Sequence, residues 1–169
     1  TAHELFKRAA AQDHASAQNN LGVMYLNGQG VFQDFTIARG WFELAAKQGH
    51  AQAQNNLGLM YQNGLSVPQD HNQAINWFEK AAMQGNLEGQ KKFQNAIESL
   101  ERKASQDANP EYQYRLGTMY HKGQGVPQNF KTARKWYEKA AKGGHKKAKH
   151  FLSILNFQNI VTHRNKRTR

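Results

Sequence analysis

The chain repeats one helix-forming phrase at a fixed interval, and this repeat constrains its fold more than any other feature. The phrase Leu-Gly-x-Met-Tyr occurs three times, with its glycine at Gly22, Gly58 and Gly117. A tryptophan follows each of these glycines after 19 residues, and the first two copies lie 36 residues apart. A period of this length indicates an array of small units, none of which buries its apolar face without stacking on a neighbour.

The second copy shows how each unit encodes two helices. Apolar residues recur at helical spacing in two stretches, which end at Gly64 and Gly85, and Asp70 stands where the second stretch begins. Glycine ends a helix at low cost because it adopts the left-handed conformation, and aspartate accepts a hydrogen bond from a free amide of the first turn. The apolar residues of the first stretch form a stripe along one side of the helix, and Gly58 lies beside it. Because Gly58 has no side chain, we expect the neighbouring helix to approach closely there. The sequence predicts helices over 3–12, 15–27, 34–48, 51–63, 70–84, 87–106, 110–122, 129–142 and 146–158.

The third full copy follows the second after 59 residues instead of 36, so residues 86–108 form a shortened unit. They keep a helical apolar rhythm without the glycine-rich loop, which predicts one long helix or two fused ones. Asn109-Pro110 restarts the regular pattern as a cap followed by proline at the first helical position. We expect a single solenoid over 1–158: a half repeat 1–13, repeats 14–49 and 50–85, the shortened repeat 86–108, a repeat 109–144 and a closing helix 145–158. A basic tail, 159–169, follows.

The repeated phrases carry a family resemblance. Leu-Gly-x-Met-Tyr, then Gly-x-Gly-Val-Pro-Gln-Asn, then Ala-x-x-Trp-Tyr-x-x-Ala-Ala, resembles the Sel1-like repeat family, a relative of the tetratricopeptide repeats. The resemblance implies an all-α fold, a right-handed α/α superhelix of antiparallel helix pairs whose first helices line a concave face. It also implies an adaptor that acts in protein complexes, very often in bacteria.

Several classes of chemistry have no support in the sequence. The chain contains no cysteine, so it forms neither disulfides nor thiolate metal sites. No apolar run approaches the roughly 18 residues of a membrane-spanning helix. His14, His50 and His145 occupy one repeat position, so they spread along the array instead of converging on a metal. We find no Ser-His-Asp arrangement and no paired carboxylates, and we predict no catalytic residues, no metal and no cofactor.

The candidate partner-binding residues lie on the first helices, opposite the apolar stripe. Winding at about 100° per residue from that stripe identifies the outward positions of each unit. They are Asn19, Val23 and Leu26; Asn55, Leu59 and Gln62; Lys91, Asn95 and Glu98; Tyr114, Thr118 and His121; and His150, Ile154 and Phe157. Apolar residues rimmed by amides suit an extended or helical peptide. The alternative is that the valine and leucines among them only pack against the next helix.

Charge is distributed unevenly along the chain. Residues 1–85 hold 5 Lys/Arg against 6 Asp/Glu, whereas residues 86–169 hold 18 against 6. This asymmetry indicates an anionic partner or a solubilising surface. The basic patch consists of Lys131, Arg134, Lys135, Lys139, Lys142, Lys146, Lys147 and Lys149.

These patterns favour a non-catalytic scaffold that binds another protein on its concave face, and the basic half favours an acidic partner. An inhibitor or immunity protein that occludes a bacterial effector is a sharper version. The rival interpretation is a binder of nucleic acid or an anionic membrane through the basic patch, but the sequence contains no recognisable nucleic-acid module. The chain starts at Thr1 without a signal peptide, so we infer a processed or excised chain, periplasmic if it was exported. The oligomeric state does not follow from the sequence.

Overall fold

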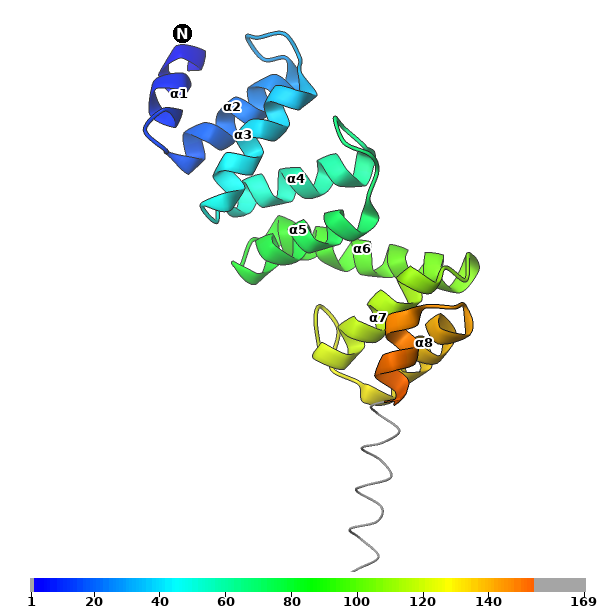
Figure 1. The fold of residues 1–169 in the computed structure, drawn as a ribbon. Helices are drawn as coiled ribbons and strands as arrows, with labels where there is room; N and C mark the ends of the chain where they lie inside the picture. Colours follow the sequence, from blue (N-terminus) through cyan, green and yellow to red (C-terminus); the bar gives the residue numbers. More distant parts are fainter. Residues whose placement is uncertain (1, 154–169) are drawn as a thin grey trace, which may run out of the picture. The chain divides into compact units, whose positions relative to one another are not determined.

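The computed structural model describes residues 2–153, and all regular elements in that range are α-helices (Figure 1). Residues 146–153 are also helical. The helices are α1 (Ala2–Ala10), α2 (Ala15–Asn27), α3 (Phe35–Lys47), α4 (Ala51–Asn63), α5 (His71–Met83), α6 (Leu87–Gln106), α7 (Pro110–Lys122) and α8 (Phe130–Lys142). The predicted ranges of these eight are confirmed to within two residues. The part of the closing helix predicted over 154–158 lies outside the described residues.

The helix ends form as the sequence predicts. The Asp70 carboxylate caps α5 by accepting hydrogen bonds from the amides of Asn72 and Gln73, at 2.8 and 3.0 Å. Asp34, Asn109 and Asn129 cap their helices in the same way. Gly64 follows α4 with φ of 69°, so it takes the left-handed conformation expected of a terminating glycine.

The described helices fall into two compact units, and the boundary lies inside α6, between Ala96 and Ile97. Unit 1 contains α1 to α5 and the first half of α6. Unit 2 contains the rest of α6, α7, α8 and the helical residues 146–153. α6 is a single helix of 20 residues, so the shortened repeat is one long helix.

Inside each pair, a glycine of the first helix meets an aromatic ring of the second. A Cβ placed on Gly22 would lie 2.5 Å from the ring of Phe42, and one on Gly117 would lie 2.6 Å from the ring of Tyr137. The close approach expected at Gly58 is confirmed, because the Phe78 ring occupies the same place there. Only glycine fits at these three positions without displacing a ring.

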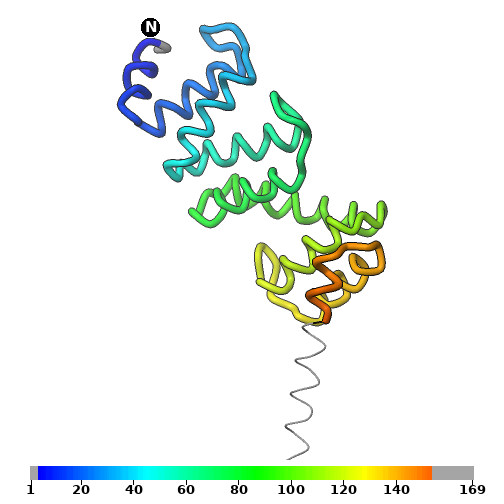
Figure 2. The backbone as a smooth tube through the Cα atoms, viewed as in Figure 1, coloured from blue at the N-terminus to red at the C-terminus, as the bar shows by residue number. Residues whose placement is uncertain are grey.

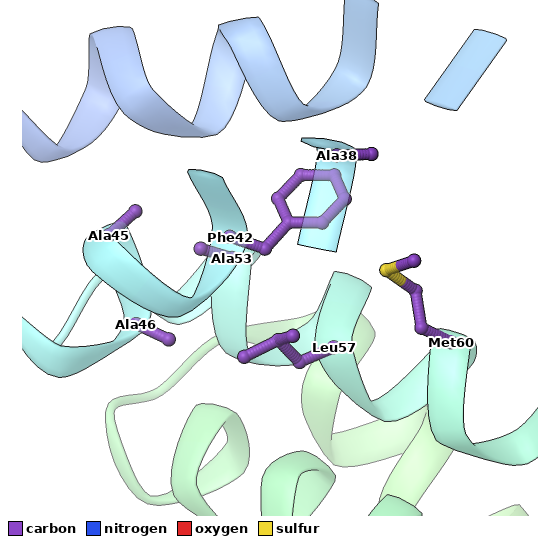
Figure 3. Close-up of a cluster of buried hydrophobic side chains, with 7 residues drawn as sticks. All are labelled: Ala38, Phe42, Ala45, Ala46, Ala53, Leu57 and Met60. Carbon is purple, nitrogen blue, oxygen red and sulfur yellow. The ribbon is translucent and has the colours of Figure 1, made fainter. Parts of the chain in front are cut away.

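The core is a series of small clusters between adjacent helices. In unit 1, Phe42 of α3 and Leu57 and Met60 of α4 are at most 1% exposed and lie among alanines of both helices (Figure 3). The tryptophan before each buried aromatic is only half-buried. Trp77, for example, packs on the edge of the cluster around Phe42. The second aromatic of each Trp-aromatic pair therefore fills the core.

Buried glutamines join successive pairs. Gln54, which is 5% exposed, donates through Nε2 to the Ala46 carbonyl at 3.2 Å and accepts from Gln84 at 2.6 Å. Gln18 makes the equivalent bonds to Ala10 and Gln48. A second glutamine holds the wide loop within each pair, which Figure 2 traces, by donating at 2.8 Å to a carbonyl seven residues earlier. These pairs are Gln33 with Leu26, Gln69 with Gln62, and Gln128 with His121.

Candidate protein-binding surface

The surface predicted to bind a partner is formed by the first helix of each pair: α2 and α4 in unit 1, and α7 in unit 2. In unit 1 these first helices touch one another directly. Asn56 of α4 donates through Nδ2 to Oδ1 of Asn19 on α2, at 3.1 Å. α2 and α4 therefore each contact another first helix as well as their own second helix.

This arrangement corrects the predicted position of two asparagines. Asn19 is 6% exposed and Asn55 is 0% exposed, so neither lies on the outward face where helical winding placed it. The winding estimate treats a first helix as packed on one side, whereas the adjacent first helix covers a second side. Both amide atoms of Asn55 are buried and lack a hydrogen-bond partner among the described residues.

The other four predicted positions on α2 and α4 are all partly buried, but only two of them pack against the core cluster around Phe42. Val23 and Leu26 are half-buried and pack against the core cluster around Phe42. For these two, the structure supports the alternative that they pack between helices. Leu59 and Gln62 of α4 are also half-buried, and the backbone of Gln62 accepts the loop hydrogen bond from Gln69.

In unit 2 the predicted positions form an aromatic cluster. The Tyr114 ring stacks on His145 with centroids 4.2 Å apart, and His121 makes an edge contact with Phe151 at 5.1 Å. The Tyr137 hydroxyl lies 3.4 Å from Oγ1 of Thr118, and burial raises the pKa of Tyr137. Tyr114, Thr118 and His121 are thus half-buried packing residues of this cluster.

The remaining predicted positions lie on two helices. Lys91, Asn95 and Glu98 of α6 are exposed, as is His150. Ile154 and Phe157 lie outside the described residues.

The accessible amides of unit 1 stand one residue later than predicted. Asn20 of α2 is exposed and Asn56 of α4 is half-buried, and Asn27 and Asn63 are exposed at the ends of the same helices. The sequence contains a signal for this shift, since both helices carry two adjacent asparagines. In α2 the second asparagine stays exposed, whereas in α4 Asn56 is only partly exposed and reaches Asn19 through its hydrogen bond.

The basic patch lies on the surface of unit 2. Its seven lysines are exposed, whereas Arg134 is half-buried and forms an ion pair with Glu138 at 2.9 Å. The Lys139 ammonium lies over the Trp136 ring, 4.5 Å from its centroid. The patch is therefore an accessible cationic surface with one internal acid.

Two histidines near these surfaces cap helices. Nδ1 of His50 accepts a hydrogen bond from the Ala53 amide at 3.2 Å and caps α4, and burial lowers the pKa of this histidine. His145 caps the helical residues 146–153 in the same way and contacts Glu111 at 3.0 Å. Within residues 2–153, no three histidine, aspartate or glutamate side chains gather as a metal site would require. None of the helices in that range is long and apolar enough to cross a membrane.

Comparison with known proteins gives a consistent set of relatives. A family model described as Sel1 repeat matches residues 1–14, 15–50, 51–86 and 110–145. A protective antigen of uropathogenic Escherichia coli strains that displays an SLR fold is 32% identical, with a TM-score of 0.54 over 93% of this chain and 36% of that one. A Sel1 repeat protein from Oxalobacter formigenes is 26% identical, with a TM-score of 0.53 over 86% of this chain and 63% of that one. The chain thus spans less than two thirds of either structure. No curated protein matches the sequence significantly.

Proposed function

The chain belongs to the Sel1 repeat family, and from that premise we propose that it is a non-catalytic adaptor that binds a partner protein on the first helices of unit 1. Proteins of this family generally mediate protein–protein interactions and are generally non-catalytic scaffolds. We assign partner binding to the first helices of unit 1 because several of their side chains remain accessible after the helices have packed.

The observation that carries the proposal is the set of amides on α2 and α4. Asn20 and Asn63 are exposed, and Leu59 adds a partly exposed apolar group. A side-chain amide has both donors and an acceptor, so it can pair with the N–H and the C=O of a peptide backbone. These residues suit an extended or helical segment of a partner, with Leu59 as the apolar contact.

The test uses Leu59→Glu. The immobilised protein captures its partner from cells of its source, and calorimetry measures affinity with the purified pair. We expect Leu59→Glu to weaken binding about tenfold, equivalent to about 1.4 kcal/mol, because it places a charge in the apolar contact. Its melting temperature should stay near that of the parent. If the captured partner is a bacterial effector, its activity is assayed with and without this protein. A loss of effector activity would support the hypothesis that this protein is an inhibitor or immunity protein.

Two variants serve as controls. Leu44→Glu makes the same change at a residue 44% exposed on α3, a second helix, and should leave binding intact. Leu26→Glu should instead destabilise the protein by about 1–3 kcal/mol, because Leu26 packs on the core. Unchanged affinity for the Leu59 variant, or equal losses for the Leu59 and Leu44 variants, would contradict the proposed surface.

A further inference from the structure

Four lysines form one row along the exposed face of α8. Lys131, Lys135, Lys139 and Lys142 stand at helical positions i, i+4, i+8 and i+11, and all four are exposed. The buried residues of the same helix, Ala133, Tyr137 and Ala140, lie on its opposite face. The row extends about 16 Å at 1.5 Å per residue. We call it the lysine row.

The lysine row is not part of the repeat packing. The matching positions of α3 are Thr36, Gly40, Leu44 and Lys47, and those of α5 are Asn72, Asn76, Lys80 and Met83. Each of those helices has a lysine at only one of the four positions, and each still packs against a first helix as α8 does. Like charges three or four residues apart repel, so the row lowers the stability of α8 unless something outside the helix compensates it.

Nothing among the described residues compensates the row fully. None of its four lysines forms an ion pair there, and the nearby acid Glu138 is held by Arg134 at 2.9 Å. Helical winding places the Arg134–Glu138 pair along one edge of the row and Trp136 along the other. Trp136 is half-buried, and the ammonium of Lys139 lies over its ring, 4.5 Å from the centroid.

We propose that the lysine row is a second binding surface, which takes an acidic amphipathic segment of a protein. Carboxylates would meet the lysines, and an apolar side chain would pack against the part of Trp136 that Lys139 leaves uncovered. The border of the row favours this occupant over nucleic acid, because the Arg134–Glu138 pair places an acid beside the lysines, which a protein segment of mixed charge can match and a phosphate backbone cannot. The surface lies in unit 2 and goes beyond the function proposed for unit 1.

The test measures direct binding of defined probes to the full chain by fluorescence anisotropy. The first probe is a synthetic peptide with glutamates at the spacing of the lysine row and a leucine at the position that would face Trp136. The second has the same composition in scrambled order. The third is single-stranded DNA of equal length, and the fourth is a vesicle of phosphatidylglycerol.

Two quadruple variants with the same loss of charge are compared. One carries Lys131→Gln, Lys135→Gln, Lys139→Gln and Lys142→Gln. The control carries Lys7→Gln, Lys47→Gln, Lys91→Gln and Lys122→Gln, all at exposed positions. We expect the row variant to bind the patterned peptide about tenfold more weakly, and the control to bind it within about twofold of the parent, because only the row supplies convergent charge. Leu59→Glu should not change this affinity, which separates the inference from the proposed function.

Three results would overturn the proposal. Equal losses in the two quadruple variants would mean that net charge alone attracts the peptide. Tighter, row-dependent binding of the DNA or the vesicle would assign the row to phosphate groups instead of a protein. Absence of peptide binding to the parent, or equal affinity for the scrambled peptide, would show that the row does not read an acidic pattern.

Discussion

At the scale of single residues, Asn19 and Asn55 occupy the same repeat position but differ in hydrogen bonding. Asn19 accepts a hydrogen bond from Asn56 at 3.1 Å, whereas neither amide atom of the fully buried Asn55 has a partner among the described residues. Thirty-six residues beyond Asn56, the shortened repeat carries Lys92 in place of an asparagine. Asn55 is thus a buried amide without a hydrogen-bond partner among the described residues.

We expect Asn55→Leu to stabilise the protein. An unpaired buried amide costs about 1–3 kcal/mol, and leucine fills a similar volume without that cost. Thermal unfolding followed by circular dichroism should show a higher melting temperature. Asn19→Leu is the matched control and should lower stability by about 1 kcal/mol, because it removes a bonded amide. A loss of stability in both variants would mean that the Asn55 amide is satisfied in solution.

At the scale of elements, the contact between a glycine and an aromatic ring sets how closely the two helices of a pair approach. Gly58→Ala should destabilise the α4–α5 pair by about 1–3 kcal/mol, because the new methyl group would overlap the Phe78 ring. Gly40 lies inside α3, and a Cβ there would meet nothing within 4 Å. Gly40→Ala should therefore stabilise by about 0.5–1 kcal/mol through helix propensity alone. Chemical denaturation measures both, and a gain at Gly58 would refute the packing argument.

Helix boundaries are predictable from this sequence because they depend on local interactions. Asp70 caps with its own side chain, and Gly64 ends α4 through its own backbone conformation. The accessible face is harder to predict because it depends on neighbours. Helical winding placed Asn55 on the accessible face, but Asn55 is 0% exposed, because a helix in a repeat array is covered on more than one side. The adjacent asparagines hold the needed information, but only the packing shows which of them is buried.

At the scale of the whole molecule, the two halves of the chain carry very different charge. Residues 97–169, the range of unit 2, hold 16 Lys/Arg against 5 Asp/Glu, while residues 1–96 hold 7 of each. Exposed charges are screened beyond about 8 Å at physiological ionic strength, so repulsion within the basic half weakens as salt rises. In a repeat protein, stability is approximately a sum of unit and interface terms. Salt should therefore stabilise unit 2 more than unit 1.

Hydrogen exchange measured at low and high sodium chloride tests this difference. The lysine row alone contains three like-charge pairs at helical contact spacing, each costing about 0.2–0.5 kcal/mol at low salt. Screening them should raise the protection of α7 and α8 by about 1 kcal/mol, while α2 to α5 change much less. The variant that replaces the four lysines of the row with glutamine should show a smaller response in α8. An equal gain in both units would point to a general salt effect on apolar burial, which acts wherever a core is present and does not depend on these charges.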